Sequence, residues 1–196
     1  MSHTYLASRT ASTTHPILEV LAERWSPRSF QGRPVDAAKL DSALEAARWS
    51  PSANNVQPWR FIVASHGTEA FDTIVGALLG FNQSWAVNAG ALLVGVAVTT
   101  DAEGKPQPWA QYDLGQAIAH LSIQAHHDGL HVHQMGGFDP EALRAAFGLA
   151  EGMVPVSVSA IGDVDAPEAL PEGVLREREA APRERLALDD IVLVRQ

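Results

Sequence analysis

The sequence predicts one domain that combines α-helices with β-strands. The chain has 196 residues, of which 46% are hydrophobic, and this is enough to fill an ordinary core. Segments with helical spacing of apolar residues alternate with short apolar runs that are typical of strands. No apolar stretch reaches the length of a membrane span and no signal sequence is evident, so we expect a cytoplasmic protein without a membrane partner.

Two helices follow a polar segment at the N-terminus. Residues 1–14 lack any apolar period and predict a flexible arm. Pro16 begins a short helix that ends near Arg24, with Ile17, Leu18 and Leu21 as its apolar face. Asp36 caps the next helix, which ends near Ser50. Its buried stripe consists of Leu40, Ala43, Leu44 and Ala47.

The middle of the chain predicts two strands and two helices. Residues 60–64 form a short strand, and helical spacing over residues 71–78 predicts a helix after it. The continuous β-branched run at residues 91–98 is typical of a strand buried on both faces, so we expect it in mid-sheet. Residues 112–127 predict a helix rich in small residues and buried nearly all round.

The last part of the chain changes character after Asp163. Before it we expect a strand at residues 131–135, a helix from Asp139 to Gly148 and a strand at residues 154–161. After it Pro, Glu and Arg dominate, and the apolar run Ile191–Val194 predicts a closing strand. A polar segment that ends in a strand suggests an arm reaching another subunit. We therefore expect a flexible arm (1–14), a core domain (15–163) and a C-terminal arm (164–196).

Composition restricts the chemistry. The net charge of −9 argues against nucleic acid as a partner, because such binding requires a dense cationic face. The absence of cysteine excludes thiolate nucleophiles and iron–sulfur clusters, so redox chemistry has to come from a cofactor. Only Lys39 and Lys105 are lysine among 14 basic residues, and the remaining arginines can grip phosphate in a fixed fork.

Two arginine pairs and one amide-rich loop are the candidate binding segments. Because Pro27 favours extended geometry, Arg24, Ser26 and Arg28 share a face that suits a phosphate dianion. A solvated helix end would explain the same residues. Arg183 and Arg185 form a second pair, which a solvated charge run would also explain. The loop at residues 50–59 offers the amide donors and acceptors that a flavin pyrimidine requires, or else is a plain turn.

In content, order and spacing, five motifs resemble those of the nitroreductase family. They are Arg24-x-Ser26-x-Arg28-x-Phe30, Ser50-Pro51-Ser52-x-x-Asn55-x-Gln57-Pro58-Trp59, Tyr112-Asp113-Leu114-Gly115, Gly137-Phe138-Asp139 and Arg183-x-Arg185-Leu186. The resemblance runs from about residue 15 to residue 192. It implies an α+β fold with a central mixed β-sheet flanked by helices. It further implies a homodimer that exchanges its C-terminal arms and binds FMN at the interface.

The resemblance also implies roles for individual residues. Arg24, Ser26 and Arg28 would bind the FMN phosphate and the nearby ribityl and pyrimidine edge, and Arg183 and Arg185 would join them at the phosphate. In the other protomer's site, Pro51, Ser52 and Ala53 would pack on the flavin, while Asn55 and Gln57 would bond the ribityl chain or the ring edge. The backbone N–H of Gly137 would point at flavin N5, with Asn82 on the pyrimidine side. Trp25 and Gly136 complete the implied cofactor-binding set.

The implied activity passes hydride from NADH or NADPH through FMN to a small electrophilic acceptor, such as a nitro compound or a quinone, by ping-pong turnover. No side chain is expected to serve as a catalytic acid or base. The chain lacks the lysine that many members carry near Trp85 and the acidic residue that some carry at Gly136, which leaves Arg28 as charge partner of the reduced ring.

Other activities stay open. A reductase of an activated carbonyl or alkene, or a dehalogenating or flavin-consuming enzyme, would use the same fold. A flavin-binding protein without turnover is the alternative from another class.

Three further patterns of the sequence concern metals, nucleotides and a substrate pocket. The histidines at 120, 126, 127, 131 and 133 form a patch, but the strand that carries the last two offers no third zinc ligand, so we expect no metal. No dinucleotide fingerprint and no phosphate loop follow the expected strands. Phe81, Trp85 and Trp109 either shape a pocket over the flavin or pack in the core or dimer interface.

Overall fold

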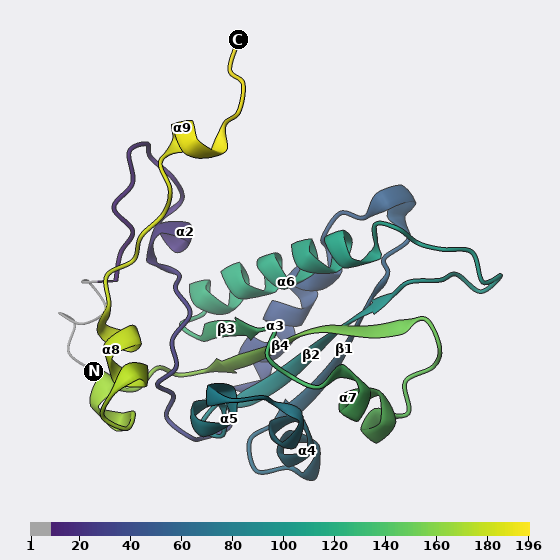
Figure 1. Ribbon diagram of the computed structural model, residues 1–196, viewed down its shortest axis with the longest axis horizontal. Helices are drawn as coiled ribbons and strands as arrows, with labels where there is room; N and C mark the ends of the chain where they lie inside the picture. Colours follow the sequence, from purple (N-terminus) through teal and green to yellow (C-terminus); the bar gives the residue numbers. More distant parts are fainter. Residues whose placement is uncertain (1–8) are drawn as a thin grey trace.

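The centre of the protein is a four-stranded β-sheet. The structure is a computed structural model, in which residues 9–196 are described. The strand order is β1-β2-β4-β3 (Figure 1). The strands are β1 (Trp59–Ser65), β2 (Ala91–Val98), β3 (His131–Met135) and β4 (Met153–Gly162). The α+β class is confirmed, but all three strand pairs are antiparallel, so the described chain alone does not form the mixed sheet that the resemblance implied.

β2 lies in the middle of the sheet, as its continuous apolar run predicts. It pairs with β1 on one side and with β4 on the other, and only Val98 at its end is not fully buried. Because successive side chains alternate between the faces, Leu92 and Val94 enter one core cluster while Ala91 and Leu93 enter the other. The sheet therefore carries a hydrophobic core on each face.

Three helices cover one face of the sheet (Figure 1). They are α4 (Glu69–Ala77), α5 (Phe81–Ala86) and α7 (Pro140–Phe147). The spacing of apolar residues predicts α4 and α7, whereas α5 was not predicted because six residues are too few to show a period.

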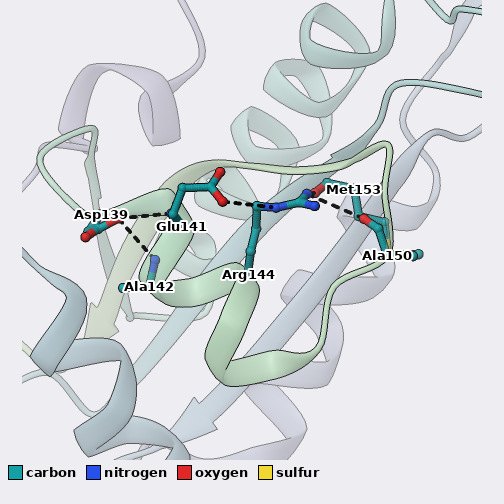
Figure 2. A network of polar contacts seen from close by, with 6 residues as sticks. All are labelled: Asp139, Glu141, Ala142, Arg144, Ala150 and Met153. Atoms are coloured by element: carbon teal, nitrogen blue, oxygen red, sulfur yellow. Dashed lines mark hydrogen bonds and ion pairs between the residues drawn. The ribbon is translucent and has the colours of Figure 1, made fainter.

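The two ends of α7 are fixed by polar contacts (Figure 2). Asp139 accepts hydrogen bonds from the N–H groups of Glu141 and Ala142, and Gly148 ends the helix in the left-handed conformation, as predicted. Arg144 donates to the carbonyls of Ala150 and Met153, and so attaches the helix to the start of β4.

The opposite face of the sheet is covered by α3 (Ala37–Arg48) and α6 (Ala110–His127). Asp36 caps α3, and Leu40, Ala43 and Ala47 are buried as predicted. α6 buries one face, but Tyr112, Gly115 and Ala119 on the other are exposed. The expectation of burial nearly all round is therefore wrong for the single chain, because no described element covers this outer face.

The N-terminal helix is shorter than expected. α2 spans Glu19–Glu23 instead of beginning at Pro16, and Ile17, Leu18 and Leu21 are exposed. The predicted apolar face is wrong because no other part of the described chain packs on it. Most of the expected flexible arm, residues 1–8, lies outside the described residues. Of the remainder, Arg9 is buried and the N–H of Ala11 donates to the carbonyl of Ala22.

The C-terminal segment first packs on the core and then leaves it. It contains η2 (Pro167–Ala169), α8 (Val174–Ala180) and α9 (Leu188–Ile191). Leu170 and Leu175 join the core cluster to which α4, α5 and α7 contribute, whereas the residues after α9 extend away from the sheet (Figure 1). The strand expected at Ile191–Val194 is wrong for the single chain, since a strand requires a neighbouring edge and Leu193 is 93% exposed.

Among the described helices, none combines the length and the apolar character needed to cross a membrane.

Candidate cofactor-binding site

The segment from Arg24 to Phe30 is extended and alternates between two environments. Trp25, Pro27 and Ser29 are buried, whereas Arg24, Ser26 and Arg28 are half-buried. This period of two is the one that Pro27 predicts. Arg24 Nη1 donates to Ser26 Oγ at 3.5 Å, so a guanidinium and a hydroxyl lie side by side at the surface.

Arginines from the two ends of the chain converge on one cavity of about 240 Å³, which we call the arginine cavity. The N-terminal part contributes Arg24, Trp25 and Ser26, and the C-terminal segment contributes Arg183 and Arg185. Arg9, Arg178 and Glu184 also line it. Of the five side chains predicted to bind the phosphate, Arg24, Ser26, Arg183 and Arg185 therefore come together in this cavity, whereas Arg28 does not line it.

The arginines of this cavity act on one another electrostatically. Burial, and then the charge of Arg185, lower the pKa of Arg24. Burial, and then the charges of Arg24, Arg185 and Arg9, lower the pKa of Arg183. Each guanidinium is therefore held close to like charges. Together these charges create a positive potential that favours a multiply charged anion.

The side chain of Arg28 is not part of the cavity wall, but its backbone is fixed by a buried carboxylate. Glu179 of α8 is fully buried, and its two oxygens accept the N–H groups of Arg28 at 2.9 Å and Ser29 at 3.3 Å. Burial raises the pKa of Glu179, while these hydrogen bonds and the charge of Arg28 act in the opposite direction. Through this contact α8 holds the extended segment in place.

Arg183 joins the two ends of the chain directly. Its Nη1 donates to the carbonyls of Arg9 at 2.7 Å and Ala22 at 2.6 Å. These bonds occupy one edge of the guanidinium and orient it. The arginine cavity thus has walls from three separate segments.

The amide-rich loop is held by α6. It contains η1 (Ala53–Asn55), and Asn54, Asn55 and Gln57 have positive φ angles of 51°, 56° and 53°. Asn is among the residues that tolerate this conformation best. Two contacts attach the loop to α6: the Ala53 N–H donates to Asp113 Oδ2 at 3.1 Å, and Ser50 Oγ lies 2.7 Å from His120 Nδ1.

Polar contacts inside the loop fix its shape. Ser52 Oγ accepts from the N–H of Gln57 at 3.0 Å, and the Gln57 side chain donates to the carbonyl of Asn55 at 2.9 Å. Pro51 and the amide residues face solvent at the surface of the single chain, and Ala53 lines a second cavity of about 310 Å³. The loop is therefore preformed rather than a loose turn.

The amide-rich loop and the arginine cavity lie near opposite ends of α6. Asp113 in the first turn holds the loop. In the last turn, burial and then the charges of Arg24 and Arg183 lower the pKa of His126. At about 1.5 Å per residue, the 13 residues from Asp113 to His126 correspond to about 20 Å along the axis of α6. The loop and the arginines line two different cavities of the single chain.

Asn82 and Gly137 meet beside the end of β3. Asn82 Nδ2 donates to the carbonyl of Gly137 at 3.1 Å, and a Cβ atom on Gly137 would lie 2.8 Å from that nitrogen. No hydrogen bond leads from the Gly137 N–H to another described residue. At Gly136 an added Cβ would meet open space. The backbone is therefore open to solvent at Gly136, whereas Asn82 covers one side of Gly137.

The three candidate pocket aromatics divide into two groups. Trp85 is 1% exposed, stacks with Phe30 and contacts the ring of His133, so it belongs to the core and cannot form a pocket wall. Phe81 and Trp109 are exposed, and Trp109 lines the 310 Å³ cavity beside Ala53. The pocket interpretation is therefore wrong for Trp85, whose bulky indole fills the space under α5.

The histidine patch shows no grouping of three or more His, Cys, Asp or Glu side chains suited to a metal within residues 9–196. Burial lowers the pKa of His131 to about 3, with His126 and Arg24 acting in the same direction. Burial also lowers the pKa of His133 to about 4, against the hydrogen bond that its ring makes to the Pro27 carbonyl. Both rings are neutral at physiological pH.

Sequence reasoning missed four residues of the site. Arg9 and Arg178 line the arginine cavity, Glu179 fixes its extended wall, and Asp113 fixes the loop. Asp113 lies inside a recognised motif, which is a usable signal. An isolated arginine in a polar arm and alternating charges at residues 176–179 give none.

The chain matches a model of the nitroreductase family over residues 21–84 and 68–163. It belongs to this family. An uncharacterized 15.4 kDa protein of Mycolicibacterium smegmatis is 40% identical over 143 residues, which cover 67% of this chain and 92% of that protein. The oxygen-insensitive NAD(P)H nitroreductase of Salmonella typhimurium is 26% identical over 199 residues, which cover 76% of this chain and 92% of that protein.

Among solved structures, the chain resembles a crystal structure described as an oxidoreductase containing FMN. The two share 35% sequence identity and superpose with a TM-score of 0.87 over 93% of each chain. The similarity therefore extends beyond the segments matched by the family model.

Proposed function

We propose that this chain is an FMN-dependent oxidoreductase that passes hydride from NADH or NADPH to a small electrophilic acceptor, such as a nitro compound or a quinone, by ping-pong turnover. Family membership and the similarity to a protein described as containing FMN support the reaction class. The observation that carries the proposal is the arginine cavity, in which Arg24, Ser26, Arg183 and Arg185 meet.

These four residues suit the FMN phosphate. Guanidinium groups supply both charge and paired donors to a phosphate, and the Ser26 hydroxyl adds a neutral donor. Half-buried arginines that repel one another are stabilised when a dianion enters. Arg28 follows on the same face of the segment and would lie nearer the ring, where its charge favours the anionic reduced form.

The remaining residues would orient the isoalloxazine ring. Phe30 stacks on Trp85 under α5, which connects the wall of the arginine cavity to the region of Asn82 and Gly137. The Gly137 N–H would donate to the ring and the Asn82 amide would serve the pyrimidine side. Bound FMN supplies the redox chemistry, while the protein binds the phosphate, orients the ring and limits access of water.

A homodimer would complete the site. Since the amide-rich loop and the arginine cavity of one chain lie near opposite ends of α6, Pro51, Ser52, Ala53, Asn55 and Gln57 would serve the flavin of the partner. The exposed outer face of α6 and the apolar residues of the C-terminal tail would be buried in this dimer. We retain the division into a core domain and an exchanged C-terminal arm as part of the proposal.

The absorption spectrum of the purified protein tests the reaction. We expect flavin bands in the visible range that bleach when NADH or NADPH is added without oxygen and return when a quinone or nitro compound follows. A colourless protein that takes up no FMN would contradict cofactor binding. A yellow protein that neither nicotinamide bleaches would favour the flavin-binding protein without turnover.

A further inference from the structure

Arg9 lies outside the family match and outside every motif of the sequence, yet it is a wall of the arginine cavity. The structure assigns to Arg9 a direct role in binding the phosphate of FMN, as a ligand contributed by the N-terminal segment. The inference rests on the proposed function and adds a residue to it.

The position of the Arg9 side chain is fixed before any ligand enters. Its guanidinium lies over the ring of Trp25, 4.3 Å from the centroid, and its Nη1 donates to the carbonyl of Ala181. Only 7% of the residue is exposed. A stacked and anchored guanidinium loses little conformational entropy on binding, so its hydrogen bonds to a phosphate come at low cost.

Arg9 also has unused hydrogen-bonding capacity. Its buried Nε has no hydrogen-bond partner among the described residues. A buried donor without a partner is unfavourable, and native structures usually satisfy such a group with water or a ligand. A phosphate oxygen in the cavity would supply such an acceptor.

The charges around Arg9 favour an anion of more than one charge. Five arginines and Glu184 line the cavity, although the chain as a whole carries a net charge of −9. Arg9 is one of the like charges that lower the pKa of Arg183. The buried Glu179 offsets Arg9 only in part, since the charge of Arg9 acts on Glu179 less than the charge of Arg28 does.

A purely structural role is the competing explanation. Arg9 contacts Ala181 and receives a hydrogen bond from Arg183, so it also joins the two ends of the chain. A structural role predicts that the loss of Arg9 weakens the binding of all flavins equally. A phosphate role predicts a loss for FMN alone, because riboflavin has the same ring and ribityl chain without the phosphate.

The test compares FMN with riboflavin on the full-length protein freed of flavin. Binding is followed by quenching of flavin fluorescence in the wild type, Arg9→Gln, Arg9→Lys and Arg24→Gln. We expect Arg9→Gln to weaken FMN binding by roughly 10- to 100-fold and to leave the affinity for riboflavin within about twofold of the wild-type value. Arg9→Lys should fall between, because it keeps the charge and loses the fork. Arg48→Gln, at an exposed ion pair with Glu45, is the matched control and should change neither.

The outcomes separate the two proposals. An equal loss for FMN and riboflavin in Arg9→Gln, or unchanged FMN affinity, overturns the role of Arg9 while a selective loss in Arg24→Gln preserves the proposed function. A wild type that binds no FMN overturns both. If Arg9→Gln does not fold, Arg9→Lys decides, and so does inorganic phosphate: it should raise the melting temperature of the flavin-free wild type more than that of Arg9→Lys, and an equal rise contradicts the assignment.

Discussion

Single residues decide whether the proposed phosphate site functions. Arg24 and Arg185 come from opposite ends of the chain, and the pKa of Arg24 is lowered by burial and by Arg185. Such mutual repulsion is unfavourable in the empty protein and is relieved by an anion. Arginine at these positions is therefore better explained by ligand binding than by stability of the fold.

We expect Arg24→Ala and Arg185→Ala each to reduce FMN affinity by about 1.5 to 3 kcal/mol, because each removes a charge-assisted contact to the phosphate. Calorimetric titration of the flavin-free protein measures the loss. Arg48→Ala, an exposed arginine outside the cavity, should bind FMN like the wild type. Wild-type affinity in both cavity variants would refute the phosphate assignment.

Two buried histidines set a pH dependence of stability. Burial lowers the pKa of His131 to about 3 and that of His133 to about 4, whereas an unfolded histidine titrates near pH 6.5. The unfolded state therefore binds protons first as the pH falls below about 6.5. The stability that both neutral rings contribute is complete above that pH and declines toward their folded-state pKa values.

We expect the free energy of unfolding to fall by about 2 kcal/mol for each of the two histidines between about pH 7.5 and about pH 5. Urea denaturation at the two pH values measures it. His131→Gln should show a correspondingly smaller difference, and His127→Gln, at an exposed position, should keep the wild-type difference. An unchanged pH dependence in His131→Gln would mean that this ring is protonated in the folded protein.

At the scale of elements, long segments with a clear period were predictable and short ones were not. The bounds of β2 and β3 agree with the sequence prediction, and α3 and α7 begin at their predicted caps, because burial on one face and a capping side chain both leave a local pattern. α5 and α8 have six and seven residues and depend on tertiary packing. The apolar stripe before α2 and the tail at 191–194 look like core residues in the sequence but lack a partner in one chain.

The site was predictable to the same extent. The resemblance implied that Arg24, Ser26, Arg183 and Arg185 meet, and they line one cavity, but Arg28 of the same motif is not part of its wall. Arg9 and Glu179 were not predictable, since only the folded chain brings residues so far apart in sequence into contact.

α8 supplies a direct test of how one element supports another. Glu179→Ala leaves the N–H groups of Arg28 and Ser29 without their acceptor and removes a buried negative charge near Arg28. We expect it to lower the free energy of unfolding by about 2 to 4 kcal/mol and to weaken FMN binding. Chemical denaturation and FMN titration measure the two effects.

Glu177→Ala, on the exposed face of the same helix, controls for helix propensity and should have little effect. Glu179→Gln retains the shape and one acceptor, so it should lie between. If Glu179→Ala were as stable as Glu177→Ala, α8 would have no role in fixing the extended segment.

At the scale of the whole molecule, two truncations separate the fold from the proposed dimer. Ending the chain after Asp163 removes Leu170, Leu175 and Glu179 from the interior and Arg183 and Arg185 from the cavity, so we expect flavin-free and poorly folded protein. Ending it after Leu186 removes only residues that are exposed in the single chain, apart from the half-buried Val192. We expect this shorter loss to leave a folded protomer whose dimer is weaker.

Light scattering coupled to size-exclusion chromatography measures the oligomeric state of both truncated proteins, and the visible spectrum measures their flavin content. A yellow and stable dimer from the chain ending at Asp163 would remove arm exchange from the account. A chain ending at Leu186 that dimerises as tightly as the full protein would show that the tail is not part of the interface.

The central claim is that arginines from the two ends of the chain bind one FMN phosphate. A crystal structure of the protein grown with FMN tests it most directly. We predict the phosphate in the arginine cavity, within hydrogen-bond distance of Arg24, Ser26, Arg183 and Arg185, with the partner's amide-rich loop against the ring. A flavin bound elsewhere, or a phosphate that none of these side chains contacts, would contradict the account.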